Sequence, residues 1–380
     1  MGRKKTPGLY KRSGVWHIDK QVRGHRLCES TGEEDLEKAV EHLARRIDQS
    51  RQESVYGVRP TRTFRQAATK HLNESGKDSI GRDAQDLKLL DPFIGSMALD
   101  RVHSGTVQGF ITARKAQGKK SATINRSLAV VRHILNLAAG EWLDEHGITW
   151  LAAAPKIKLL SLRDARQPYP LSWEEQRLLF EELPPHLGQM ALFKVNTGCR
   201  EQEVCGLKWE WELPIPELDT VAFLIPSSEV KNREDRLVVL NRVAKSVIDG
   251  VRGKHPEYVF TYKGQRVGRI YNSAWKRARE AAAGQYQEAL GQACPEGFRK
   301  VRVHDLKHTY GRRLRAAGVS FEDRQDLLGH KSGRMTTHYS AAELTNLIKA
   351  SNKVCENKSR KSPALVVLKK RYAQATPAAA

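Results

Sequence analysis

The chain has 380 residues, enough for two or three domains that each bury their own core. Lys and Arg outnumber Asp and Glu by 65 to 43, a formal net charge of +22 that indicates a polyanionic partner: nucleic acid, the ribosome or an anionic membrane. No apolar run approaches the roughly 20 residues of a membrane span, and the basic start lacks the apolar stretch of a secretory signal, so we expect a cytoplasmic protein that does not enter a membrane.

Residues 1–57 predict a small sheet backed by a helix. Strand-like runs at 15–22 and 25–28 are bounded by glycine-containing turns, and apolar residues repeat at helical spacing from Asp35. The first 26 residues hold eight Lys or Arg and one acidic residue, with aromatic residues interleaved, which suits a sheet laid against phosphates. The candidate DNA contacts here are Lys4, Lys5, Lys11, Arg12, Trp16, Arg23 and Arg26.

Residues 63–150 predict an all-α domain. They hold no strand signal, and helical patterns cover 64–72, 83–89, 104–117 and 121–139. Lys119 and Lys120 precede the last of these helices, whose N-terminus would also attract a phosphate. We take both as candidate DNA contacts, and a solvated turn explains them equally well.

Residues 151–171 are rich in proline and basic residues and predict an extended connector that marks the main domain boundary. Ser172 can cap the helix that opens a third domain, residues 172–350. Strands are expected there near 221–225 and 236–240 among helices. Residues 351–380 predict a basic, disordered tail. The fold class is therefore mainly α with small β-sheets.

The five cysteines are odd in number, without a C-x-x-C pair or a metal-ligand spacing, and indicate buried reduced thiols. His304 and His308 could imitate a zinc pair, but no acidic third ligand follows at a recognised spacing. We therefore expect no metal. Lys231 and the polar residues after it would, on their own, indicate an ordinary hairpin turn.

Four segments of the third domain carry polar groups in a fixed order: TGCREQEVCGLKW, EVKNREDRLVVL, HDLKHTYGRRL and LLGHKSGRMTTHYS. In this order the chain resembles the tyrosine recombinase (phage integrase) family. Its α+β catalytic domain supplies an Arg, a hairpin Lys, a His-x-x-Arg, a second His or Trp, and a Tyr. The matching catalytic residues are Arg200, Lys231, His304, Lys307, His330 and Tyr339, with Glu203 as a support for Arg200.

The resemblance implies a reaction without ATP or any other cofactor. Tyr339 would attack a backbone phosphorus, form a 3′-phosphotyrosyl ester and expel a 5′-hydroxyl. Arg200 would stabilise the charge on the phosphate oxygens where a metal would otherwise serve. Lys231 would protonate the leaving oxygen, and His304 would accept the tyrosyl proton or donate to the phosphate.

Lys307 departs from the family pattern, which has Arg at this position. Lysine keeps the charge but loses the planar two-pronged donor set. A second hypothesis is therefore a DNA-binding, architectural factor with weakened cleavage, and a third is a relaxation activity like that of type IB topoisomerases. An integrase of a phage or other mobile element is our first hypothesis, since a pure binder needs no acid and base residues.

The front of the chain extends the resemblance. Residues 1–57 resemble the three-stranded arm-binding module of many integrases, and 63–150 agree with the helical, SAM-like core-binding domain. The implied partner is double-stranded DNA at core-type and arm-type sites, bound by a homotetramer that passes through a Holliday junction in a bacterial nucleoid. The helix at 342–350 would pack on a neighbouring protomer, with packing in its own domain as the alternative. Accessory proteins for DNA bending or excision would be further partners.

Overall fold

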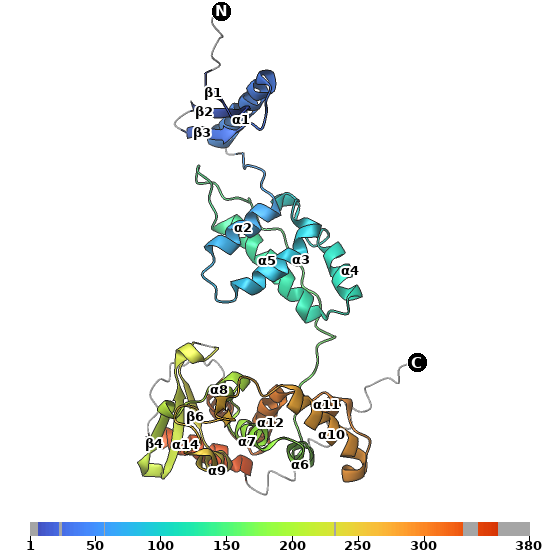
Figure 1. Ribbon diagram of the computed structural model, residues 1–380, viewed down its shortest axis with the longest axis vertical. Coiled ribbons are helices and arrows are strands. Elements are labelled where there is room, and N and C mark those ends of the chain that lie inside the picture. The colour runs from blue at the N-terminus through green and yellow to red at the C-terminus, as the bar shows by residue number, and fades with distance from the viewer. Residues whose placement is uncertain (1–6, 23–24, 57, 232, 330–340, 356–380) are drawn as a thin grey trace, which may run out of the picture. The chain divides into compact units, whose positions relative to one another are not determined.

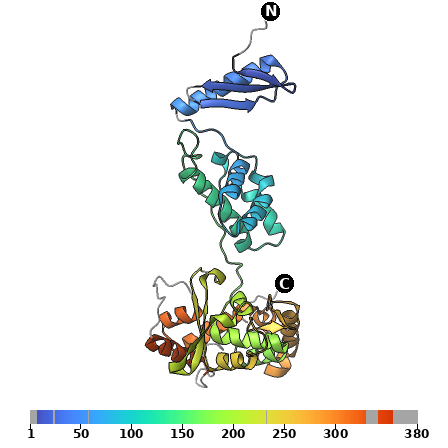
Figure 2. The same cartoon turned by 60° about the vertical axis from the view of Figure 1, so that its left-hand side comes forward.

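The computed structural model describes residues 7–22, 25–56, 58–231, 233–329 and 341–355. It divides the chain into two units, residues 1–166 and 167–380, which are described separately below (Figures 1 and 2). None of the described helices is long and apolar enough to cross a membrane. The predicted fold class, mainly helical with small antiparallel sheets, is confirmed.

The first unit begins with a three-stranded antiparallel sheet and one helix. The elements are β1 (Leu9–Arg12), β2 (Val15–Val22), β3 (His25–Ser30) and α1 (Leu36–Tyr56). Ser13 and Gly14 join β1 to β2 with φ angles of 48° and 87°, the backbone that a two-residue hairpin turn requires. Ile18 and Leu27 of the sheet pack on Leu43 of α1, which gives this part a small core of its own.

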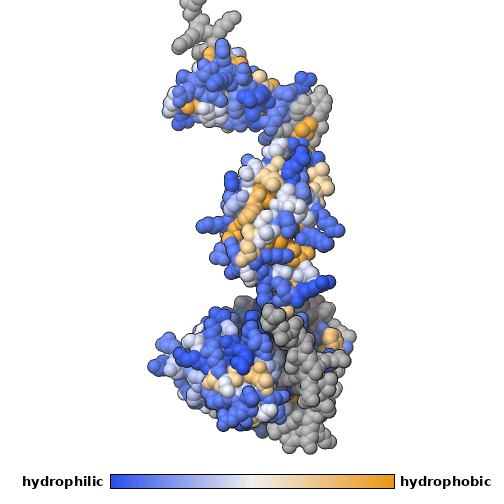
Figure 3. Space-filling model, turned by 90° about the vertical axis from the view of Figure 1, so that its right-hand side faces the viewer, coloured by the Kyte–Doolittle hydropathy of each residue, from blue (hydrophilic) through white to orange (hydrophobic). Residues whose placement is uncertain are grey.

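Four helices form the rest of the first unit, as predicted: α2 (Phe64–Glu74), α3 (Ile80–Ile94), α4 (Gln108–Ala116) and α5 (Ser121–Gly140). Thr63 and Gln66 form a reciprocal capping box at the start of α2. Leu90, Phe110 and Leu128 are fully buried between the helices. On the face shown in Figure 3 this part carries apolar patches among hydrophilic residues.

The connector, residues 151–171, contains no helix or strand, but it is not a free spacer. Leu151 and Ile157 are buried in the core of the helical part. The amide of Asn125 binds the backbone of Leu160 twice, donating to its carbonyl at 2.8 Å and accepting from its N–H at 2.7 Å. The first part of the connector is therefore a packed strap, a tertiary contact that its composition did not reveal.

The second unit surrounds a three-stranded antiparallel sheet of order β4-β5-β6 with helices (Figure 1). Its strands are β4 (Glu212–Ile215), β5 (Thr220–Ile225), β6 (Arg236–Val239), β7 (Thr261–Tyr262) and β8 (Gln265–Arg266). Its helices are α6 (Trp173–Glu181), α7 (Pro185–Thr197), α8 (Glu201–Cys205), α9 (Arg242–Val251), α10 (Ser273–Leu290), α11 (Glu296–Arg299), α12 (Val303–Ala316), α13 (Phe321–Leu328) and α14 (Ala341–Asn352). Strands β5 and β6 lie where they were predicted, whereas β4 and the short pair β7-β8 were missed.

The prediction of a tail over residues 351–380 is wrong for residues 351–355. Val354 is fully buried, and the hydroxyls of Ser351 and Tyr310 are 2.7 Å apart in a buried hydrogen bond. Leu347 of α14 is buried in the same cluster as Tyr310. In the single chain α14 thus packs on its own domain, and residues 351–355 belong to that domain as well.

Candidate active site

Arg200 and Glu203 form a rigid pair at the start of α8. Gly198 turns the chain out of α7 with a φ of +67°, and a Cβ there would lie 2.7 Å from the ring of Tyr310. Glu203, 4% exposed, accepts from the Arg200 N–H and Nη1, each at 2.7 Å. Burial would raise the pKa of Glu203, but the charge of Arg236 and the bonds from Arg200 lower it below its usual value. The predicted support role of Glu203 is consistent with this geometry.

Lys307 lies on α12 and is 5% exposed. Its ammonium donates to the carbonyl of Gly198 at 2.7 Å and to the carbonyl of Leu328. Burial, and after it the charge of Arg236, lowers the pKa of Lys307 to about 7. Lys307 therefore connects the turn before Arg200 to the end of α13, and the sequence did not reveal those contacts.

His304 stands one turn before Lys307 on α12; the residue as a whole is exposed, although its imidazole is partly desolvated. Desolvation, and then the charge of Lys194, lowers the pKa of His304 to about 4. A neutral imidazole at neutral pH can accept a proton. The ring of His308 lies edge-on to that of His304, with centroids 4.9 Å apart.

Two buried cations of this region were missed by the sequence analysis. Lys194 of α7 is fully buried and donates to the carbonyl of Cys199, next to Arg200. Desolvation lowers the pKa of Lys194 to about 8. Arg236 begins β6 and is 4% exposed. Lys194 stands alone in the apolar run ALFKV, and a lone cation in such a run is the signal that could have found it. Arg236 follows the polar residues 231–235 and carries no such signal.

Of the three remaining predicted catalytic residues, Lys231 is described by the structure and two are not. Lys231 lies in the exposed loop between β5 and β6. Within the described part of the chain, it shares none of the hydrogen bonds that join Arg200, Glu203 and Lys307. His330 and Tyr339 lie outside the described residues.

The end of the connector is fixed to the helix that carries His304 and Lys307. The N–H of Tyr169 donates to Asp305 at 3.1 Å, and the N–H of Leu171 donates to Thr309 at 3.0 Å. The Tyr169 hydroxyl donates to the buried carboxylate of Glu175 at 2.8 Å. The chain that enters this unit is therefore held by α12 itself.

The predicted DNA contacts of the N-terminal sheet divide between its two faces. Strand residues two apart face the same side, so Trp16 lies on the face of Ile18, which packs on α1. Lys11 pairs with Trp16 in register, and its ammonium is 5.7 Å from the centre of the Trp16 ring. Arg12 and Arg26 lie on the opposite, open face. The open face is therefore the better candidate for DNA.

Other candidate DNA contacts are engaged within the protein or fall outside the described residues. Arg26 forms two hydrogen bonds of 2.8 Å with Asp19. At the start of α5 the carboxylate of Asp164 accepts from the Ser121 N–H at 2.6 Å, and Lys120 donates to the Asp164 carbonyl at 3.1 Å. Lys119 is exposed. Lys4, Lys5 and Arg23 lie outside the described residues.

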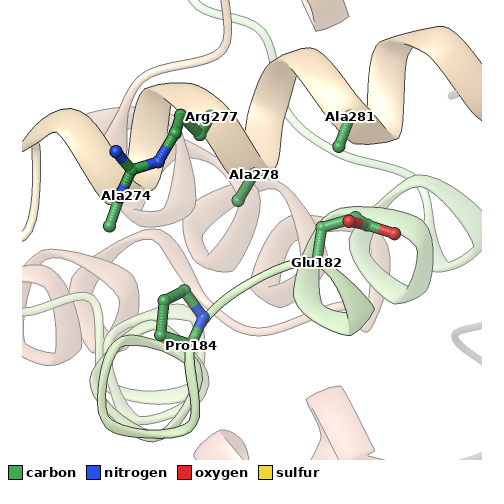
Figure 4. A pocket seen from close by; sticks show the side chains of 6 residues that line it. All are labelled: Glu182, Pro184, Ala274, Arg277, Ala278 and Ala281. Carbon is green, nitrogen blue, oxygen red and sulfur yellow. The ribbon is translucent and has the colours of Figure 1, made fainter.

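A groove of about 180 Å³ lies between α10 and the turn from α6 to α7 (Figure 4). Its walls are Glu182, Pro184, Ala274, Arg277, Ala278 and Ala281, none of them a predicted site residue. Among the described residues no three His, Cys, Asp or Glu side chains gather in a way that could hold a metal ion. The cluster around Arg200 is therefore the stronger candidate site.

Comparison with known proteins identifies related chains. Residues 177–345 match the model of the phage integrase family. The integrase of Salmonella phage P22 is 25% identical over 362 residues, 87% of this chain and 90% of that protein. The tyrosine recombinase XerC of Thermodesulfovibrio yellowstonii is 23% identical over 67% of this chain and 82% of its own length.

Two solved structures share the fold. The Tn1549 transposon integrase in complex with a circular intermediate DNA has a TM-score of 0.53 and 16% identity, over 76% of this chain and 98% of that chain. A lambda integrase dimer bound to a core site has a TM-score of 0.50 and 15% identity, over 95% and 98% of the two chains.

Proposed function

Because this chain is a tyrosine recombinase of the phage integrase family, we propose that it cuts and rejoins DNA at defined sites through a covalent bond to Tyr339. The observation that carries the proposal is that Lys307 of α12 binds the turn that precedes the Arg200–Glu203 pair of α8, so two segments distant in the sequence meet there. Their cluster adjoins the end of α13, immediately before His330.

In the proposed reaction the oxygen of Tyr339 attacks a backbone phosphorus. The bond from phosphorus to the 5′-oxygen breaks, and a 3′-phosphotyrosyl ester forms. Lys231 gives a proton to the leaving 5′-oxygen, and neutral His304 takes the proton from Tyr339. A 5′-hydroxyl of the partner strand then attacks the ester, which restores the phosphodiester and frees Tyr339.

Arg200 binds the non-bridging oxygens of the phosphate in this scheme. Its guanidinium is already oriented by Glu203, so little ordering remains to be done when charge develops in the transition state. Lys307, which binds the carbonyl of Gly198 in the turn before Arg200, adds positive charge to the site. No metal, ATP or other cofactor has a step in the scheme.

The partner is double-stranded DNA, bound at two classes of site. Residues 63–150 and the catalytic domain, which starts at 172, would hold core-type sites, while residues 1–57 would hold arm-type sites. We further propose that four copies assemble on two duplexes and integrate or excise a mobile element in the bacterial nucleoid, with accessory proteins that bend DNA. In that assembly α14 would leave its own domain for a neighbouring protomer.

The test is trapping of the covalent intermediate on nicked DNA that carries the candidate attachment site, without metal or ATP. The wild-type protein should give an adduct that survives denaturant, Tyr339→Phe should give none, and the exposed-tyrosine control Tyr262→Phe should match the wild type. Tight site-specific binding with no adduct would favour the architectural factor. Relaxation of supercoils by a monomer on DNA without the site would favour a topoisomerase.

A further inference from the structure

Three cations from separate segments hold the C-terminal turn of α13. The last carbonyls of a helix have no partner within the helix and need donors from elsewhere. Arg236 binds two of them, Lys307 binds the carbonyl of Leu328, and Nη2 of Arg200 binds the carbonyl of Gly329 at 3.3 Å. A helix C-terminus also favours positive charge, so both effects favour this arrangement.

Arg236 provides the planar part of this contact. Its Nη1 donates to the carbonyl of Asp326 and its Nη2 to the carbonyl of Leu327, both at 2.7 Å. A guanidinium presents its donors in a fixed plane and so fixes the orientation of two successive carbonyls, whereas the donors of an ammonium are not held in a plane. Because Arg236 is 4% exposed, it is not available as a surface contact for DNA.

Gly329 completes the fit. It ends α13 with a φ of +57°, and a Cβ at this position would lie 2.5 Å from the guanidinium of Arg236. Any side chain at 329 would therefore displace Arg236 or the chain. The next residue is His330, and Tyr339 follows nine positions later.

We propose that Arg236 is a positioning residue of DNA cleavage: by fixing the end of α13 against Arg200, it sets the point from which the chain runs to His330 and Tyr339. The inference rests on the proposed function. Arg236 acts through protein carbonyls alone, at the end of the helix that precedes His330 and Tyr339.

The first experiment measures single-turnover cleavage of nicked site DNA at saturating protein, beside the dissociation constant of the same DNA. Loss of a charge-assisted contact predicts that Arg236→Gln cleaves about 30-fold more slowly, and that Arg236→Lys, which keeps the buried charge, is about tenfold slower. The dissociation constant should stay within about twofold, since Arg236 contacts no DNA. Cleavage by Arg236→Gln at the wild-type rate would overturn the proposal.

A substrate with sulfur in place of the 5′-bridging oxygen separates positioning from proton donation. A thiolate leaves without a proton, so this DNA should restore cleavage by Lys231→Ala. It should leave the defect of Arg236→Gln in place, because that defect lies in the approach of Tyr339. Restoration of both variants would assign Arg236 to the leaving group and would overturn the proposal.

Gly329→Ala provides a second test that keeps Arg236 in place. Its Cβ should displace the guanidinium and slow cleavage by a similar factor, and it should cost less in the Arg236→Gln background, where the clash with the guanidinium is removed and only the strain of the +57° φ remains. Arg236→Lys serves as the background if Arg236→Gln folds poorly. Equal costs in both backgrounds would count against Arg236. Failure of the wild-type protein to form a Tyr339 adduct would remove the proposed function as well, so the two failures are distinguishable.

Discussion

Lys307→Arg tests whether the charge at position 307 is used in catalysis. Burial and the neighbouring Arg236 lower the pKa of Lys307 to about 7, so the side chain loses its proton as pH rises through neutrality. Arginine stays charged throughout this range. If only the charged form supports cleavage, the active fraction of the wild type is about one half at pH 7 and about one hundredth at pH 9. The cleavage rate of wild type relative to Lys307→Arg should therefore fall roughly 50-fold over this interval.

The assay is the second-order rate of adduct formation with DNA well below its dissociation constant, because that rate reports the pKa of the free protein. Both proteins keep Tyr339, Lys231 and His304, whose ionisations cancel in the ratio of the two rates. Lys245→Met, on the surface of α9, is the control for loss of an unrelated lysine. A ratio that stays level from pH 6 to pH 9 would refute the role of the Lys307 charge.

Folding stability should respond to pH in the opposite sense. A pKa of about 7 in the folded state, against 10.5 for an unperturbed lysine, means that the unfolded chain binds more protons between these two pH values. Stability from this group is therefore fully present above pH 10.5 and is lost as pH falls through 7. Relative to Lys307→Met, the unfolding free energy of the wild type should rise by up to about 1.4 kcal/mol per pH unit between pH 7 and pH 9. Urea denaturation of the two proteins measures this difference in unfolding free energy. A difference that fell as pH rose from 7 to 9 would contradict the lowered pKa of Lys307.

Three further substitutions probe contacts around the site and the connector. Glu203→Gln leaves Arg200 without its carboxylate partner, and cleavage at saturating DNA should fall about 30-fold while binding is retained. Tyr169→Phe removes the hydroxyl that donates to the buried Glu175, and urea denaturation should show a loss of about 1 kcal/mol. Asp164→Asn removes the carboxylate at the start of α5, so core-site DNA should bind more tightly and with a steeper salt dependence in anisotropy titrations. If a substitution left its cleavage rate, unfolding free energy or DNA affinity unchanged, the contact that it removes would not have the effect stated here.

Local patterns predicted most of the helices and the strands β2, β3, β5 and β6, because burial of one face imposes a period on the sequence. The order of the motifs located Arg200, Glu203 and Lys307. The connector docks because Leu151 and Ile157 pack into a core formed by residues distant in the sequence. Isolated apolar residues in a polar segment do not reveal such a contact. The tail boundary was predicted wrongly for the same reason, because the burial of Val354 could not be read from the polar residues around it.

The partners of buried cations were the least predictable feature, because the motifs identify residues but not the carbonyls they hold. The charges of Arg200, Arg236 and Lys307 all act on the carboxylate of Glu203, and Arg236 also repels the charge on Lys307. The pKa of Lys307 is about 7, and its deprotonation relieves the repulsion from Arg236 while no DNA is bound. A phosphate brings negative charge and favours the protonated lysine. A lysine at this position can thus match the charge of the site to the presence of its substrate, whereas an arginine would hold the full charge at all times.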